Sequence, residues 1–271
     1  MGNILVGFDF SKGSAYAVDF AIDIANRTQN DLMLVYVKEK DEDEAPIREE
    51  IERRNAGVAH LLQGIKMDYV IRNGKVHQEL CNQAKEAKSS LIIVGTHGMS
   101  GFQKNWIGRN TYRTIAESPV PVLTIREDFN FNKQLERIVV PLDNTMETRQ
   151  KLPAAIQFAR IFGSELHILG LYTSETVDIK RIVNSYVKGV GDYLTKLGIK
   201  HVCDYVSVPK NLTVTTLEYA DKINADMIVI MTEQESSLTS FLLGTYAQQM
   251  LTLSTRPVLT VRPEELFSVS K

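Results

Sequence analysis

Short apolar runs alternate along the whole chain with segments in which apolar and polar residues recur at helical spacing. The runs are rich in valine, isoleucine and leucine and contain few polar residues, which is typical of strands buried on both faces of a parallel sheet. Strands that alternate with helices predict parallel βαβ units. The runs lie at residues 3–8, 32–37, 65–71, 91–95 and 121–126, and again at 137–142, 165–171, 200–207, 226–231 and 257–262.

The segment after the first run has a clear helical pattern. Its apolar residues share one face of a helix, and either Ser11 or Ser14 could cap its start. These apolar residues are Ala15, Val18, Ala21, Ile22 and Ala25. The charged run at residues 38–54 is expected to form a solvated loop that leads into an exposed helix, with an acidic partner site as the alternative.

The second half of the chain repeats the first. Residues 121–126 are matched by 257–262 and residues 91–94 by 227–230, both 136 residues later, and residues 4–9 are matched by 138–143, 134 residues later. Three matches in one order predict two copies of one domain, at residues 1–127 and 137–271, with a linker at about 128–136. Each copy is expected to be an α/β, Rossmann-like domain with a five-stranded parallel sheet and a ligand crevice where the strand order reverses.

Composition narrows the class of protein. Of the 271 residues, 44% are hydrophobic and 24% are charged, and the formal net charge is −2. Each half can therefore bury an ordinary core, and the chain lacks the basic balance typical of nucleic-acid binding. No apolar run reaches the roughly 18 residues of a membrane span, and the N-terminus lacks a signal-peptide pattern, which predicts a cytoplasmic protein. Cys81 and Cys203 are expected to be small buried hydrophobic side chains.

Glycines are densest directly after the fourth apolar run. Gly95, Gly98 and Gly101 precede Gly108, where the next helix is expected to begin. Glycines at the carboxyl end of a parallel strand let backbone N–H groups approach a phosphate, and a helix N-terminus adds unpaired N–H donors. The spacing matches neither the dinucleotide-binding nor the P-loop motif, so a turn that only links strand to helix stays open as an alternative.

Together, the repeat and this loop resemble the universal stress protein family, as two tandem copies over nearly the whole chain. The resemblance implies a fold like that of the adenine nucleotide alpha hydrolases. ATP-binding members resemble G-x2-G-x9-G-[ST] at this loop, and Gly95, Gly98 and Gly108 have that spacing. By this resemblance, Asp9 ends the first strand beside the ligand and Val37 contacts the adenine. The nucleotide-binding residues that it implies are Gly7, Phe8, Asp9, Val37, Val94, Gly95, His97, Gly98, Gly108, Arg109 and Asn110.

One departure from the family motif lies in the first half. Arg109 stands where the family has Ser or Thr, whose hydroxyl contacts the terminal phosphates. A guanidinium could offer phosphate a charged, forked donor instead. It could equally fill the pocket or point to solvent.

The second half departs further. Met231 and Gln234 replace the first two glycines and Glu233 adds a negative charge, although Gly244 is kept. No triphosphate site is expected in this half. Asp143, which matches Asp9 in the repeat, is explained as well by a helix cap.

Three functions stay open. The first is a stress-response protein that binds ATP or a related nucleotide in its first half and acts as a sensor or switch, with Mg²⁺ only as the nucleotide's companion. The second is a protein-interaction module, with an unknown partner, that has lost nucleotide binding. The third is a slow ATP hydrolase helped by Asp9 and His97. The sequence offers no recognisable set of nucleophile, base or metal ligands, which favours a switch over a fast enzyme.

The resemblance also implies that the two halves pack as a pseudo-dimer, with the closing strands at 121–126 and 257–262 side by side. Such pairing would protect strand edges that are otherwise open to aggregation. No nucleic-acid or membrane partner is expected.

Overall fold

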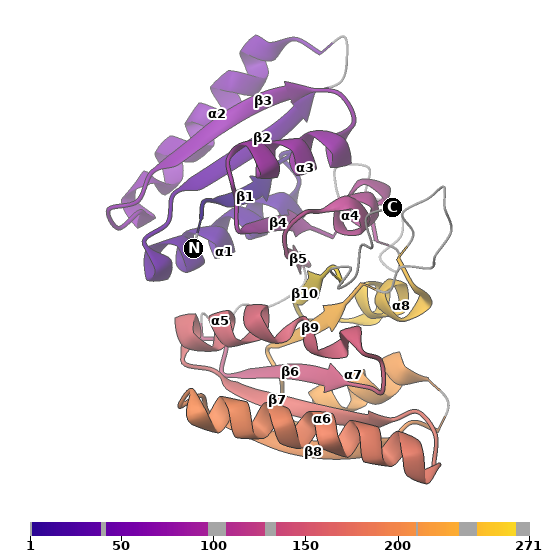
Figure 1. The fold of residues 1–271 in the computed structure, drawn as a ribbon. Helices are drawn as coiled ribbons and strands as arrows, with labels where there is room; N and C mark the ends of the chain where they lie inside the picture. Colours follow the sequence, from indigo (N-terminus) through magenta and orange to yellow (C-terminus); the bar gives the residue numbers. More distant parts are fainter. Residues whose placement is uncertain are drawn as a thin grey trace, which may run out of the picture. The chain divides into compact units, whose positions relative to one another are not determined.

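The computed structural model describes residues 2–38, 42–96, 107–127, 134–209, 211–232 and 243–263. The chain divides into two units, Met1–Asn130 and Phe131–Lys271. Figure 1 shows that each unit is an α/β fold in which helices flank a sheet. The predicted α/β class is therefore confirmed.

The first unit arranges its strands in the order β3-β2-β1-β4-β5, and all neighbouring strands in it are parallel. The strand order reverses at β1, which has β2 on one side and β4 on the other. Open α/β sheets bind ligands at such a point. The elements are β1 (Ile4–Gly7), α1 (Lys12–Thr28), β2 (Leu32–Lys38), α2 (Glu44–Val58), η1 (Ala59–Leu61), β3 (Met67–Asn73), α3 (Val76–Glu86), β4 (Leu91–Gly95), α4 (Arg109–Glu117) and β5 (Val122–Ile125).

The second unit repeats this topology, with its strands in the order β10-β9-β6-β7-β8 and all parallel. In both units the strands begin and end within two residues of the apolar runs that predicted them. The elements are β6 (Arg137–Leu142), η2 (Glu147–Arg149), α5 (Leu152–Phe162), β7 (Glu165–Tyr172), α6 (Val177–Lys196), β8 (His201–Ser207), α7 (Leu212–Lys222), β9 (Met227–Met231), α8 (Thr245–Leu253) and β10 (Val258–Val261).

Burial explains why the strands form at the apolar runs. Ile4, Leu5 and Val6 of β1 are completely buried, and removing such apolar surface from water is the main favourable contribution to folding. The start of α1 is set by a polar contact instead. Ser11 Oγ accepts a hydrogen bond from Ser14 N at 3.1 Å, so Ser11, and not Ser14, caps the helix.

The helices of the first unit lie on both faces of its sheet. Right-handed crossovers place α1 and α2 on one face and α3 and α4 on the other. Accordingly, α1 packs against β1 and β4, and α3 packs against α4, next to which it lies in Figure 1. The first turn of α3 contacts the last turn of α4, where His77 Nε2 lies 3.4 Å from Glu117 Oε1.

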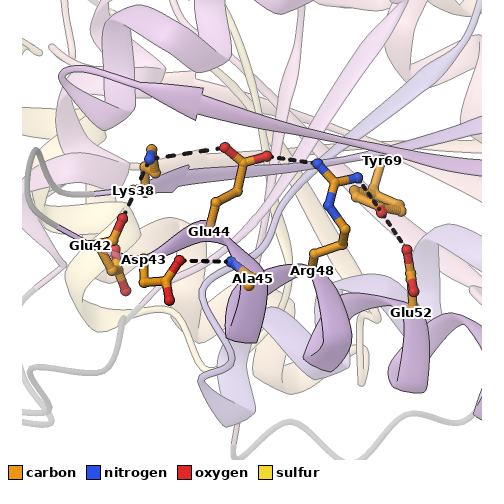
Figure 2. A network of polar contacts seen from close by, with 8 residues as sticks. All are labelled: Lys38, Glu42, Asp43, Glu44, Ala45, Arg48, Glu52 and Tyr69. Atoms are coloured by element: carbon orange, nitrogen blue, oxygen red, sulfur yellow. Dashed lines mark hydrogen bonds and ion pairs between the residues drawn. The ribbon is translucent and has the colours of Figure 1, made fainter.

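Most of the charged run after β2 forms helix α2, whose polar side chains make a network of contacts with one another and with the sheet edge (Figure 2). Arg48 Nη2 donates to Glu44 Oε1 at 2.7 Å and its Nη1 donates to the Tyr69 hydroxyl of β3 at 3.0 Å. Exposed pairs of this kind contribute little stability. The buried Ile47 and Ile51 therefore dominate the docking of α2.

Candidate functional site

The carboxyl ends of three neighbouring strands meet at one edge of the first sheet. Gly7 ends β1, and a Cβ on it would lie 3.1 Å from Val94 Cγ1 of β4, so a side chain at Gly7 would crowd Val94. Gly7 pairs with Val35 of β2, and β2 continues beyond this pair to Lys38. Val37 therefore extends past the end of β1, on the side of the strand that Val35 also faces.

Asp9 forms a tight turn after β1. Its Oδ1 accepts a hydrogen bond from Ser11 N at 3.1 Å, and its backbone N–H donates to Ser14 Oγ at 3.3 Å. Among the residues that the structure describes, none donates a hydrogen bond to Asp9 Oδ2. One carboxylate oxygen thus fixes the loop, and the other is available to a ligand.

Aromatic rings fill the space beside this turn. The side chain of Phe8 is only 5% exposed, and its backbone N–H donates to Val35 O at 3.0 Å, so the Phe8 carbonyl is what this residue can offer a ligand. Phe10 has a left-handed φ of 63°, which is uncommon for a residue other than glycine. Its ring lies 5.0 Å from that of Phe8 and 5.1 Å from that of Tyr36. The sequence pattern did not single out Phe10.

The segment between β4 and α4 is closed at its base by backbone hydrogen bonds. Gly108 N donates to Thr96 O at 2.8 Å, and Thr96 N donates to Ile125 O at 2.9 Å. Thr111 Oγ1 also donates to Gly95 O at 2.9 Å. The start of α4 is therefore fixed at the end of β4. His97 and Gly98, which belong to the predicted phosphate loop, lie outside the described residues.

Gly108 is the N-cap of α4, as the sequence predicts, and no described side chain caps this helix start. The first backbone N–H groups of α4 are therefore open to an anion, which a helix N-terminus favours. A Cβ on Gly108 would lie 3.3 Å from Thr96 O, so a side chain there would crowd the closure. Arg109 and Asn110 lie exposed in the first turn of α4.

Gly95 has a packing role that the sequence pattern did not reveal. A Cβ on Gly95 would lie 2.7 Å from the carbonyl carbon of Gly13 and 3.0 Å from Ser14 N. Because backbone cannot yield as a flexible side chain can, a glycine is needed where α1 abuts β4. Gly95 thus lies close to the backbone of a helix of the same unit, and its predicted role beside a phosphate stays a prediction.

The residues that the structure describes contain neither a metal-binding cluster nor a membrane span. No three His, Cys, Asp or Glu side chains in them gather so as to hold a metal ion. No helix in them is long and apolar enough to span a membrane.

Comparison with known proteins identifies the family. The sequence profile of the Universal stress protein family matches residues 1–126 and again residues 134–262. The chain belongs to the universal stress protein family. It is 31% identical over 146 residues to universal stress protein YxiE of Bacillus subtilis (strain 168), a match that covers 45% of this chain and 97% of that protein.

Solved universal stress proteins share the whole two-unit fold. A universal stress protein of Archaeoglobus fulgidus DSM 4304 matches 96% of this chain and 98% of its own, with a TM-score of 0.77 and 21% identity. A putative universal stress protein of Pseudomonas aeruginosa UCBPP-PA14 matches 97% and 94%, with a TM-score of 0.71 and 17% identity. At these identities the likeness shows the fold, and the ligand must be argued from the residues.

The second unit of this universal stress protein keeps the turn after its first strand. Asp143 Oδ1 accepts from Thr145 N at 2.9 Å, and Asp143 N donates to Thr148 Oγ1 at 3.2 Å. The same turn therefore forms in both units. Its recurrence shows that the Asp9 turn has a structural role in addition to any contact with a ligand.

The start of the following helix differs between the units. Met231 stands where the first unit has Gly95, and the region that matches the first turn of α1 is a 3-10 turn, η2, that contacts β9. Lys151 follows, at the position of the buried Ala17, and is itself only 3% exposed. No pattern in the sequence indicated that Lys151 is buried. Glu233 and Gln234 lie outside the described residues.

Proposed function

We propose that the first unit binds an adenine nucleotide, ATP or a close relative, and that the protein acts as a nucleotide-dependent sensor or switch in the cytoplasm. The main support for this proposal is the hydrogen bond from Gly108 N to Thr96 O. It fixes the uncapped start of α4 at the carboxyl edge of the sheet, where the strand order reverses. That place and those N–H donors suit a phosphate chain.

The other predicted residues have roles consistent with this placement. Val37 would border the adenine beyond the end of β1, and Asp9 would use its free carboxylate oxygen for a ribose hydroxyl. Gly95, Gly98 and Gly108 would shape the phosphate loop, with His97 and Asn110 as further contacts. Mg²⁺ would enter with the phosphates.

We also propose that the second unit has lost this site. Met231 places a side chain at the position where the first unit needs a glycine. The second unit also has the 3-10 turn η2 in the place of the first turn of α1. The pseudo-dimeric packing of the two halves stays a prediction from the family resemblance. If a nucleotide changes that packing, one bound ligand would be enough to signal.

A protein-interaction module without a ligand is the second candidate. It is favoured by Arg109, which is exposed and replaces the hydroxyl residue of the family motif. The two candidates differ in whether the purified protein carries a nucleotide.

The experiment is to denature freshly purified protein and to analyse the supernatant by anion-exchange chromatography. We expect about one adenine nucleotide per chain. Gly108→Val should release it, because a branched side chain would crowd Thr96 O, whereas Gly244→Val, the matched change in the second unit, should not. Thermal unfolding of both variants controls for folding. A protein that carries no nucleotide and does not respond to millimolar ATP favours the interaction module.

A further inference from the structure

The connection between β3 and α3 in the first unit contains an Asn-Gly pair. Asn73 is the last residue of β3, Gly74 follows it, and Lys75 is the N-cap residue of α3. The sequence has no other Asn-Gly pair. Both residues of the pair are exposed to water, and asparagine is one of the thermally labile residues of proteins.

The local structure requires a glycine directly after Asn73. Gly74 has a φ of 153°, a backbone conformation that residues with a side chain rarely adopt. A Cβ on Gly74 would also lie 3.0 Å from Glu79 Oε1 and 3.2 Å from Glu79 Cγ. A side chain at position 74, which would shield the backbone nitrogen there, is therefore disfavoured by both conformation and packing.

The fold leaves the two groups of this pair unengaged. Among the residues that the structure describes, none makes a hydrogen bond with the Asn73 side chain or with the Gly74 backbone N–H. Val208, which follows β8 as Gly74 follows β3, instead donates its N–H to Tyr172 O at 3.0 Å. The Asn73 side chain can thus rotate toward a backbone nitrogen that is not held elsewhere.

We propose that Asn73 is a site of spontaneous deamidation in the folded protein. The Gly74 nitrogen attacks Asn73 Cγ, so a bond forms between these two atoms and the Cγ–Nδ2 bond breaks. The proton of the Gly74 N–H leaves with Nδ2 as ammonia, and a cyclic imide remains. Water then opens the ring at either of its carbonyl carbons, which gives aspartate or isoaspartate at position 73.

Asn26 shows how the same unit holds an asparagine that is not expected to react. Its Nδ2 donates to Leu61 O at 2.8 Å, and its Oδ1 accepts from Gln63 N at 2.9 Å. It lies within α1 and is followed by Arg27, whose side chain shields the backbone nitrogen. Asn26 is therefore a control site within the same molecule.

The modification would alter a short connection. Only Gly74 and Lys75 separate β3 from α3. In isoaspartate the main chain passes through the former side chain, which inserts a methylene group just before these two residues. The N-cap of α3 makes no side-chain hydrogen bond, so the first turn of this helix should loosen in the isoaspartate form. Either product also places a carboxylate beside Lys38, which is opposite Asn73 in the register of β2 and β3.

The test incubates the purified protein at pH 7 and at pH 9 and follows Asn73 and Asn26 by peptide mass spectrometry. We expect the Asn73 peptide to gain the mass difference between OH and NH2 at least tenfold faster than the Asn26 peptide. The gain should be faster at pH 9, because the Gly74 nitrogen must lose its proton. Asn73→Gln should remove the acidic species that anion-exchange chromatography resolves in the aged wild type.

A synthetic peptide of residues 68–78 separates the fold from the sequence. If this peptide deamidates while Asn73 of the folded protein stays intact, the fold protects the pair and the proposal is overturned. Deamidation of Asn26 as fast as that of Asn73 would also overturn it.

Hydrogen exchange of the aged protein tests the effect on α3. The first turn of α3 should exchange at least threefold faster in the isoaspartate form than in fresh protein. Asn73→Asp, which adds the charge without the extra methylene, should keep the exchange rate of the wild type. Equal exchange in the isoaspartate form and in fresh protein would refute the loosening of α3.

Discussion

Lys151 offers a sharp test of the packing in the second unit. Its Nζ donates to Thr148 O at 2.7 Å and to Thr148 Oγ1 at 3.2 Å. Burial lowers the pKa of Lys151 to about 8, although the nearby Asp143 carboxylate favours the charged form. The fold therefore buries an ammonium group that the unfolded chain would expose to water. We expect Lys151→Met to remove this cost.

The sign and size of the effect follow from the two pKa values. In the unfolded chain the pKa of a lysine is about 10.4, so between about pH 8 and 10.4 the unfolded state binds more protons than the folded state. The free energy of unfolding must then rise with pH in this window. The rise due to Lys151 is at most about 3 kcal/mol, at about 1.4 kcal/mol for each pH unit of the window. Below about pH 8 this contribution is constant.

The assay follows hydrogen exchange against denaturant concentration, from pH 7 to 10, in peptides from β6 and β7, so that it reports on the second unit alone. Other titrating groups are common to both proteins and cancel in the comparison. Lys151→Met should flatten the rise in unfolding free energy, and Lys222→Met, at an exposed site in α7, should not. Parallel pH profiles for Lys151→Met and the wild type would show that Lys151 does not lose a proton on folding in this pH window.

Further predictions concern the first unit. Gly95→Ala should lower the free energy of unfolding by about 1–3 kcal/mol, because its Cβ meets the backbone of Gly13; Gly57→Ala, in an open position on α2, should raise it by about 0.5–1 kcal/mol. Chemical denaturation checks both, and equal effects would contradict the close approach. Ser11→Ala should cost about 1 kcal/mol through loss of the α1 cap, and thermal unfolding that matches the wild type would contradict that role.

Much of the fold could be predicted from the sequence because its strands are buried on both faces. Such strands are continuous apolar runs, and their duplication at a nearly constant offset indicated two copies of one domain. The cap at Gly108 was also predictable, since glycine and the helical pattern meet there. These signals are local, and local signals suffice for the order of the elements.

The packing around the site could not be predicted in the same way. A glycine is needed at position 95 because α1 packs against it. Lys151 occupies a position in the core. The close contact at Gly95 and the burial of Lys151 both depend on residues distant in sequence. Spacing within one segment carries no information about such contacts.

We propose that one unit of the two binds a nucleotide. Calorimetric titration with ATP and magnesium tests this proposal, because it measures the number of sites per chain. We expect one site, abolished by Gly108→Val and kept in Gly244→Val. A stoichiometry of two, or a single site that survives Gly108→Val and is lost in Gly244→Val, would contradict the assignment to the first unit.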